Sequence, residues 1–218
     1  MNRPIRSYVL RQGRTTPAQK RALEELLPKY GIPFGSDKIA APRPLVLEIG
    51  SGMGDTTVEI AAAHPEADFV AVEVHGPGVG SLLNRIDSRE LNNLRVIRHD
   101  AIEVLENMIA DASLAAIHLF FPDPWPKKRH HKRRMVQAGF AALAARKLKV
   151  GGILHAATDW PDYAEQIAAV FAANELFEEA ESGLVRRPVT KFESRGRRLG
   201  HPVRDLLFRR RGKAPAAR

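Results

Sequence analysis

Short apolar runs alternate with amphipathic stretches along most of the chain. Five apolar runs predict buried strands, at residues 45–50, 69–74, 94–100, 114–121 and 153–159. Helical spacing of apolar positions predicts helices between and after them, at residues 55–64, 79–91, 101–109, 135–148 and 163–173. Two later runs predict two more strands, about seven in all, at residues 177–181 and 205–210. Because alternating strands and helices form a parallel sheet with helices on both faces, the pattern predicts an α/β fold with a doubly wound sheet.

The two ends of the chain lack this alternation. Residues 1–16 are polar and basic without a period, which predicts a flexible basic arm. Residues 17–30 have helical spacing and begin with Pro17, a residue favoured in the first turn of a helix. We expect a single domain over residues 17–211 and a disordered tail over residues 212–218.

The charge of the chain indicates what kind of partner it binds. The sequence has 34 Lys and Arg residues against 25 Asp and Glu residues, a formal net charge of +9. Because the basic residues are clustered, we expect a polyanionic partner, either nucleic acid or an anionic membrane. The absence of cysteine excludes disulfides, cysteine-ligated zinc and thiol catalysis. No apolar run approaches the about 20 residues of a membrane span, and none resembles a signal peptide, so we expect a cytoplasmic protein.

A glycine-rich loop, LEIGSGMGD, follows the first predicted strand. Its glycines Gly50, Gly52 and Gly54 let the backbone approach a ligand without intervening side chains. A dinucleotide-binding loop would have glycine at position 55, where this chain has Asp55. An acid there argues against a phosphate at the helix amino terminus, and Glu48 adds a second negative charge nearby. The loop suits a ligand with adenine, ribose and a positive centre but no phosphate, and S-adenosylmethionine fits.

Two further acids stand at the ends of the next two predicted strands. Glu73 ends the second strand, where a carboxylate can accept hydrogen bonds from two ribose hydroxyls. Asp100 ends the third, where it can accept a hydrogen bond from the exocyclic amine of adenine. Because ligands of open α/β sheets lie outside the carboxyl ends of the strands, both acids and the glycine loop would share one site. The alternative is that Asp55 and Asp100 only cap the helices that follow them.

The stretch FFPDPWPKKRHHKRR leaves the fourth predicted strand and joins one acid to a long basic run. Prolines at alternate positions restrict the backbone around Asp123 and Trp125 and make the turn stiff. The Asp123 carboxylate can accept hydrogen bonds from the N1–H and the exocyclic amine of a purine base, and only guanine offers these two donors together. The basic residues 127–134 can contact nucleic-acid phosphates beside the site, and the two histidines among them predict no metal site. The alternative for this run is the solvated start of a helix.

Later parts of the chain offer a second half of the site. Asp159 ends the fifth predicted strand, so a parallel sheet places it beside Asp123. The stretch RRPVTKFESRGRR holds six basic residues around Phe192 and Glu193, which suits stacking of a base and recognition of its donors. The alternative there is a flexible loop with Phe192 packed inward.

These motifs occur together in a known family. PDPWPKKRHHKRR resembles the signature of the bacterial tRNA (guanine-N7-)-methyltransferases, the TrmB family. The blocks EIGSGMG, AVEVHGPGVG, ATDWPDYAEQ, RPVTKFESRG and GHPVRDLLF resemble that family's blocks in its order, so the resemblance covers nearly all of Val9 to Arg209. It implies a Rossmann-like class I S-adenosylmethionine-dependent methyltransferase whose last strand is antiparallel. It also implies methyl transfer to N7 of the variable-loop guanine of tRNA, at conventional position 46.

The resemblance implies a role for individual residues, with Asp123 at the position of the active-site residue. The acids that match cofactor contacts, beside the loop glycines, are Glu48, Glu73, Asp100 and Asp123. The residues that match substrate contacts are Lys127, Asp159, Thr190, Lys191, Phe192 and Glu193. The residues that match the RNA-contacting run are Arg129, His130, His131, Lys132, Arg133 and Arg134. We expect tRNA as the partner, no membrane, no obligatory protein partner, and a monomer or a homodimer.

Three other functions stay open at this point. A methyltransferase for small molecules or proteins would not need the flanking Lys and Arg runs. A non-catalytic RNA-binding protein on the same fold would not need acids at four strand ends. A nucleotide-dependent oxidoreductase is disfavoured, because the dinucleotide pattern lacks its third glycine.

Overall fold

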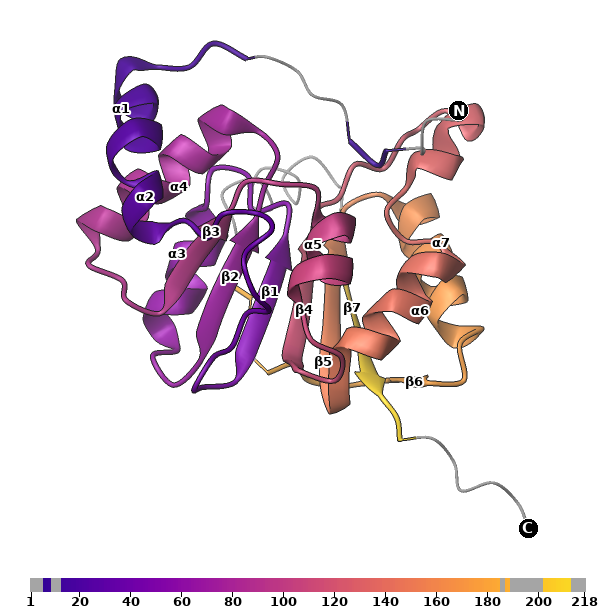
Figure 1. Ribbon diagram of the computed structural model, residues 1–218. Coiled ribbons are helices and arrows are strands. Elements are labelled where there is room, and N and C mark those ends of the chain that lie inside the picture. The colour runs from indigo at the N-terminus through magenta and orange to yellow at the C-terminus, as the bar shows by residue number, and fades with distance from the viewer. Residues whose placement is uncertain (1–5, 9–12, 185–186, 189–201, 213–218) are drawn as a thin grey trace.

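The strands of the computed structural model form one mixed sheet (Figure 1). The structure describes residues 6–8, 13–184, 187–188 and 202–212. In this part of the chain, seven strands follow the order β3-β2-β1-β4-β5-β7-β6. Their bounds are Leu45–Ile49 (β1), Asp68–Val72 (β2), Leu94–Ile97 (β3), Leu114–Phe120 (β4), Leu148–Thr158 (β5), Phe177–Glu179 (β6) and Arg204–Arg210 (β7). Strands β1 to β5 pair in parallel, and β7 is antiparallel to both β5 and β6, which confirms the predicted mostly parallel sheet with an antiparallel last strand.

The centre of the sheet is where the chain changes direction across it. Strands β1 and β4 are neighbours and are buried at every position, because both of their faces are covered. From β1 the chain proceeds outward to β2 and β3, and it then returns to β4 on the other side. In open α/β sheets, ligands bind at such a switch point, outside the carboxyl ends of the strands.

Helices cover both faces of the sheet (Figure 1). The helices of one face are α1 (Pro17–Glu25), α2 (Leu27–Tyr30), α3 (Asp55–Ala63) and α4 (Gly76–Ser88). The helices of the other face are α5 (Ala101–Met108), α6 (Ala138–Lys147) and α7 (Pro161–Ala172). Val46 packs in the first of these cores, whereas its neighbours Leu45 and Leu47 pack in the second, which confirms the doubly wound arrangement. No helix among the described residues has the length and apolar character needed to cross a membrane.

Helix α1 begins at Pro17, as the sequence predicts. Thr16 precedes it and forms a capping box, in which its hydroxyl accepts from the Gln19 backbone and its own N–H donates to the Gln19 side chain. Of the expected arm, the structure describes residues 6–8 and 13–16. The expected tail lies outside the described residues apart from Gly212.

Helix α4 starts at Gly76, three residues before the predicted start at Val79. Its first residues include glycines that allow close contact with neighbouring segments. A Cβ atom on Gly78 would lie 2.7 Å from the carbonyl oxygen of Gly52. A Cβ atom on Gly80 would lie 2.6 Å from the carbonyl oxygen of Gln19 in α1. The glycines therefore let α4 approach both the glycine-rich loop and α1, a tertiary gain that local helix propensity does not contain.

The region around α6 differs most from the prediction. The expected helix from Met135 begins only at Ala138, and before it the Val136 N–H donates to the Tyr163 hydroxyl at 3.1 Å. Gly151 and Gly152 were expected to separate helix from strand, but β5 begins at Leu148, directly after α6. The two glycines lie inside β5, where the register against β4 shifts and Gly151 adopts a φ of 81°.

Candidate active site

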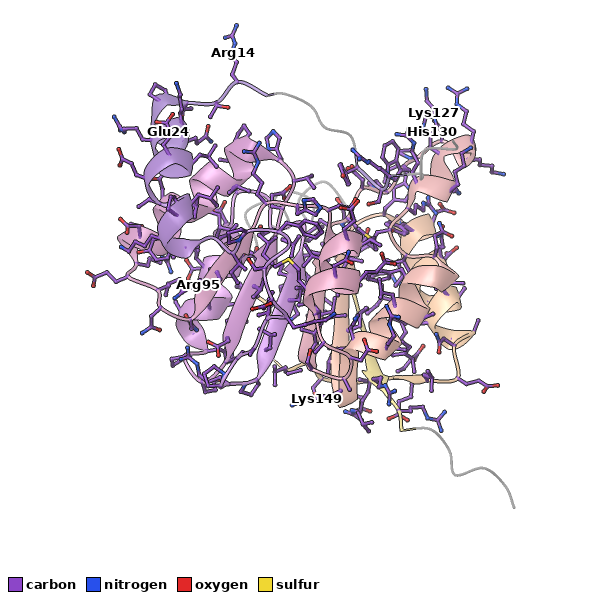
Figure 2. The ribbon with its side chains drawn as sticks, viewed as in Figure 1. Arg14, Glu24, Arg95, Lys127, His130 and Lys149 are labelled. Atoms are coloured by element: carbon purple, nitrogen blue, oxygen red, sulfur yellow. The ribbon has the colours of Figure 1, made fainter. Side chains whose placement is uncertain are left out.

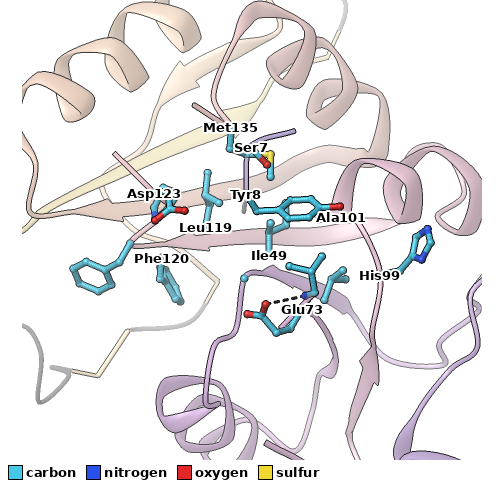
Figure 3. Close-up of a pocket in the computed structure, with 15 residues that line it drawn as sticks. Ser7, Tyr8, Ile49, Glu73, His99, Ala101, Leu119, Phe120, Asp123 and Met135 are labelled. Carbon is cyan, nitrogen blue, oxygen red and sulfur yellow. Dashed lines mark hydrogen bonds between the residues drawn. The ribbon is translucent and has the colours of Figure 1, made fainter. Parts of the chain in front are cut away.

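A cavity of about 240 Å³ lies at the carboxyl ends of the central strands (Figure 3). Its walls come from the ends of β1, β2 and β4 and from the start of α5, and they include Gly50, Glu73 and Asp123. Ser7 and Tyr8 of the amino-terminal segment also line it, and the Tyr8 ring lies close to Ala101 in this view. The structure thus places three of the predicted site residues around one cavity at the expected edge of the sheet.

The glycine-rich loop leaves open backbone beside this cavity. Gly50, Gly52 and Gly54 have φ values of 75°, 57° and 80°, in the left-handed region that favours glycine. Cβ atoms on Gly50 or Gly52 would meet no atom within 4 Å, so the open space there is available to a ligand. Gly54 instead serves the fold: it occupies the N-cap position of α3 and packs against Leu82.

Glu73 organises the loop as well as facing the cavity. One carboxylate oxygen accepts the Gly52 N–H at 2.8 Å, and the other accepts the N–H groups of Val74 and His75, both at 2.8 Å. These bonds hold the end of β2 against the glycine-rich loop. Carboxylate oxygens have about four acceptor sites in all, so one remains for a ligand hydroxyl.

Glu48 lies beneath the loop, and among the described residues it is not one that lines the cavity. Its side chain is buried, Oε1 accepts a hydrogen bond from the Thr57 hydroxyl at 2.9 Å, and Oε2 has no hydrogen-bond partner. Burial raises the pKa of Glu48 to about 7. The hydroxyl of Ser51, in the loop itself, is also buried without a partner. Among the described residues, neither Glu48 Oε2 nor the Ser51 hydroxyl has a hydrogen-bond partner. Because unsatisfied buried polar atoms are costly, these two atoms are typical of a site that is completed by a ligand.

Of the two acids that could cap a helix, Asp100 does so and Asp55 does not. Asp100 is the N-cap of α5, where its Oδ1 accepts the Ile102 N–H at 2.8 Å, and it lies near Tyr8. Burial and the neighbouring Asp100 carboxylate raise the pKa of the Tyr8 hydroxyl. Asp55 is not a cap, because Gly54 has that position, and Asp55 pairs with Arg85 at 2.8 Å instead.

Asp123 is exposed at the rim of the cavity, on a turn with unusual backbone geometry. Phe121 and Trp125 on either side of it have φ values of 51° and 46°. Each such backbone conformation costs about 1–3 kcal/mol and persists only where surrounding contacts hold it. The Trp125 indole donates to the Ser7 carbonyl at 3.0 Å, and the Arg133 guanidinium lies 4.8 Å from the indole ring centre. These contacts, together with the prolines, fix the turn that presents Asp123.

The basic run after Asp123 forms a 3-10 helix, Lys128–Arg133, at the edge of the site. Lys127 and His130 extend away from the body of the protein (Figure 2). The most exposed side chains of the run are those of Lys127, Lys128, Arg129 and Lys132. Partial burial, and then the neighbouring Arg129 and Arg133, lower the pKa of His130. The exposed cations lie on this short helix and directly before it, so the positive surface follows Asp123 closely along the chain.

Arg134 was expected to contact RNA, but in this structure it contacts other parts of the protein instead. Its side chain is only 1% exposed. The guanidinium donates to the Pro124 carbonyl at 2.8 Å, to the Gln166 side chain at 2.7 Å, and to Asp162. It therefore anchors the proline-rich turn to α7 and presents no charge to a partner.

Of the remaining predicted residues, the structure places Asp159 on the side of the site next to β5. Asp159 follows the last residue of β5, and β5 is the parallel neighbour of β4, so Asp159 and Asp123 leave adjacent strands. The four predicted substrate contacts Thr190, Lys191, Phe192 and Glu193 lie outside the described residues. Sequence reasoning missed Ser7 and Tyr8 in the cavity wall, since nothing in a basic, aperiodic segment marks a residue that will fold back onto a distant strand.

Comparison with known proteins identifies the family. A family model described as "Putative methyltransferase" matches residues 42–206. The chain is 56% identical to a tRNA (guanine-N(7)-)-methyltransferase of Nitrosomonas eutropha, over 94% of this chain and 96% of the relative. It is 54% identical to the protein of the same name from Methylobacillus flagellatus, over 96% of this chain and 92% of the relative.

A solved structure supports the fold. Precorrin-6y C5,15-methyltransferase from Geobacter metallireducens superposes with a TM-score of 0.55 at 12% identity, over 88% of each chain. A cavity at the switch point, an open glycine-rich loop and acids at successive strand ends agree with both comparisons. The chain belongs to the tRNA (guanine-N(7)-)-methyltransferase family.

Proposed function

We propose that this protein transfers a methyl group from S-adenosylmethionine to N7 of a guanine in tRNA, and that the target is the variable-loop guanine at conventional position 46. One observation supports this most directly: an exposed acid at the rim of the cofactor cavity, Asp123, is followed at once by an exposed basic helix. The acid suits a guanine and the basic helix suits the phosphates that flank it. The relatives that share more than half of this sequence carry the name of this activity.

The residues around the cavity fit S-adenosylmethionine. Gly50 and Gly52 leave open space, and Glu73 keeps acceptor capacity for a ribose hydroxyl. We assign Asp100, at the end of the third strand, to the exocyclic amine of adenine. The unpartnered Ser51 hydroxyl and Glu48 carboxylate oxygen offer further polar contacts beside the loop. When bound, S-adenosylmethionine supplies an electrophilic methyl group on a sulfonium. No phosphate has to be placed near Asp55.

The chemistry asks the protein to position the base rather than to remove a proton. N7 of guanine carries a lone pair and no proton, so the transfer needs no general base. The protein has to hold N7 at about 3 Å from the methyl carbon and in line with the bond between that carbon and the sulfur. Asp123 and Asp159, which leave adjacent strands, would orient the guanine, and their negative charge favours the cationic 7-methylguanine product.

The tRNA is held mainly through its phosphates. We assign phosphate contacts to the basic residues 127–133, and we remove Arg134 from this set. A base engaged in the folded tRNA has to be exposed before it can react, at a cost of a few kcal/mol that phosphate contacts offset. Thr190, Lys191, Phe192 and Glu193 complete the proposed guanine site by their match to the family.

The decisive experiment measures methyl transfer from labelled S-adenosylmethionine to unmodified tRNA, followed by digestion to nucleosides. The proposal expects 7-methylguanosine, and it expects the product to vanish when the variable-loop guanine is replaced. Transfer to a different nucleoside would contradict the proposed target. Binding of tRNA without binding of S-adenosylmethionine would favour a non-catalytic RNA-binding protein.

A further inference from the structure

An ion pair links two parts of the chain on either side of the proposed guanine-binding segment. Arg187 Nε donates to Asp205 Oδ1 at 3.0 Å, and Arg187 Nη2 donates to Asp205 Oδ2 at 2.9 Å. The Arg187 side chain is 4% exposed and that of Asp205 is 37% exposed, so the pair is partly shielded from water. A two-bond arginine–carboxylate pair fixes orientation as well as distance. The pair therefore joins Arg187 firmly to the start of β7.

Asp205 also binds the sheet. Its Oδ1 receives a hydrogen bond from Nε2 of His155, at 2.8 Å, from the middle of β5. Nδ1 of His155 is buried and has no hydrogen-bond partner among the described residues, which favours the tautomer with its proton on Nε2. Burial raises the pKa of Asp205, but the hydrogen bonds from His155 and Arg187 outweigh it and hold the pKa well below its ordinary range. The carboxylate therefore stays charged and keeps both partners.

Arg187 also contacts the start of the turn that carries Asp123. Its guanidinium carbon lies 5.8 Å from the ring centre of Phe120 and 5.4 Å from that of Phe121, within the range of a cation–π contact. Phe121 is the residue with the left-handed φ, and its N–H donates to the Ala157 carbonyl of β5 at 2.7 Å. The arginine thus packs on the two residues at the point where β4 ends and the Asp123 turn begins.

We propose that Arg187, Asp205 and His155 are positioning residues that hold the end of β4, and with it the turn that presents Asp123 to the guanine. Arg187 packs on Phe120 and Phe121 at the end of β4, and Asp205 ties Arg187 to His155 of β5. This inference rests on the proposed function and deepens it. Among the described residues that line the cofactor cavity, none is Arg187, Asp205 or His155, so the network acts on the base rather than on the methyl donor.

The test replaces Asp205 by asparagine, which keeps the size of the side chain and removes its charge. The kcat and KM for tRNA, the Kd for S-adenosylmethionine by calorimetry, and the urea unfolding midpoint are then measured. The inference expects kcat at saturating tRNA to fall at least tenfold, while the Kd for S-adenosylmethionine changes less than twofold. The matched control is Asp68→Asn, because Asp68 also pairs with an arginine, Arg43, but at the opposite ends of the strands. The control is expected to lose stability and to keep its kcat.

Two results would overturn the inference. The first is an Asp205→Asn protein that keeps its kcat within twofold while its unfolding midpoint falls as far as that of Asp68→Asn. The second is a parallel loss of kcat and of S-adenosylmethionine affinity, since it would mean that the whole site has collapsed. If Asp205→Asn does not fold, Arg187→Lys gives the same test, because it keeps the charge but removes the planar two-bond contact. A wild-type protein that methylates no tRNA would instead contradict the proposed function, which separates the two failures.

Discussion

Asp123 lies where a single carboxylate can act on the base without holding the protein together. It is exposed at the rim of the cavity, on a turn that other residues fix. We expect Asp123→Asn to lower kcat by about 100-fold, because a charge aimed at the developing positive charge of the base is lost. The Kd for tRNA should change less than threefold, because phosphate contacts dominate that affinity. Transfer assays at saturating tRNA and filter binding measure the two quantities.

The control for Asp123 is Asp55→Asn. Asp55 is also an exposed acid near the glycine-rich loop, but it pairs with Arg85 on the surface. Its replacement should leave kcat within about twofold, because an exposed ion pair contributes little. Equal losses of transfer and of tRNA binding in Asp123→Asn would show that Asp123 serves binding rather than the reaction.

Glu48 gives the folded protein a pH dependence of the opposite sign to that of most acids. Its pKa is raised to about 7 by burial, so the folded state keeps a proton that the unfolded state has lost. The stabilising contribution is complete below the ordinary pKa of a glutamate and is lost as the pH rises through about 7. Because one pKa unit corresponds to about 1.4 kcal/mol, the loss by pH 8 is at most about 3 kcal/mol.

Glu48→Gln tests this sign, because the amide cannot ionise. In urea unfolding without ligand, the free energy of unfolding of the variant relative to wild type should increase from pH 5 to about pH 7 and level off by pH 8. Two curves that run parallel over this range would contradict the raised pKa. The same variant should bind S-adenosylmethionine more weakly, if the unpartnered Oε2 contacts the ligand as proposed.

The proline-rich turn and the basic 3-10 helix act as one element because Arg134 holds both. We expect Arg134→Lys to lower the free energy of unfolding by about 1–3 kcal/mol, since lysine cannot replace the contacts to Pro124, Gln166 and Asp162 together. The dependence of tRNA affinity on salt should stay unchanged, because a buried arginine neutralises no phosphate. A shallower salt dependence in this variant would restore Arg134 to the RNA-contacting surface.

Elements with a local signal were predictable from sequence, and those decided by distant contacts were not. The five parallel strands follow from apolar runs, and α1 follows from Pro17 and the helical spacing after it. The early start of α4 was missed because glycine disfavours a helix locally, whereas here Gly78 permits contact with the glycine-rich loop. The late start of α6 was missed, since the sequence does not show that the residues before it contact another helix, where the Val136 N–H donates to the Tyr163 hydroxyl.

The candidate site divides in the same way. Its acids were found because the carboxyl ends of parallel strands always meet at one edge, whichever residues fill the core. The partners of those acids could not be found, since Glu73 bonds a backbone N–H 21 residues away and His155 bonds Asp205 50 residues away. Nor does the sequence distinguish Arg134, which is buried, from the exposed Lys132 two residues before it.

On the scale of the whole molecule, the positive charge is arranged for a large anion that reaches the cavity from one side. Lys127 and His130 stand at the cavity end of the sheet, whereas Arg95 and Lys149 lie well away from it (Figure 2). The net charge of +9 would attract tRNA to any face, so only the local contacts at the basic helix give it an orientation. Salt dependence distinguishes these two contributions.

A pair of double variants separates contact from net charge, because each removes one lysine and one arginine. Replacing Lys128 and Arg129 by alanine should reduce the slope of log Kd against log salt by about 1–2, since each phosphate contact releases counterions. Replacing Arg95 and Lys149 changes the net charge equally and should leave the slope within about 0.3 of wild type. Titrations of tRNA from 50 to about 300 mM salt measure both slopes. If the two double variants lose the same slope, tRNA binds through the overall charge, and the helix after Asp123 does not direct the guanine to the cavity.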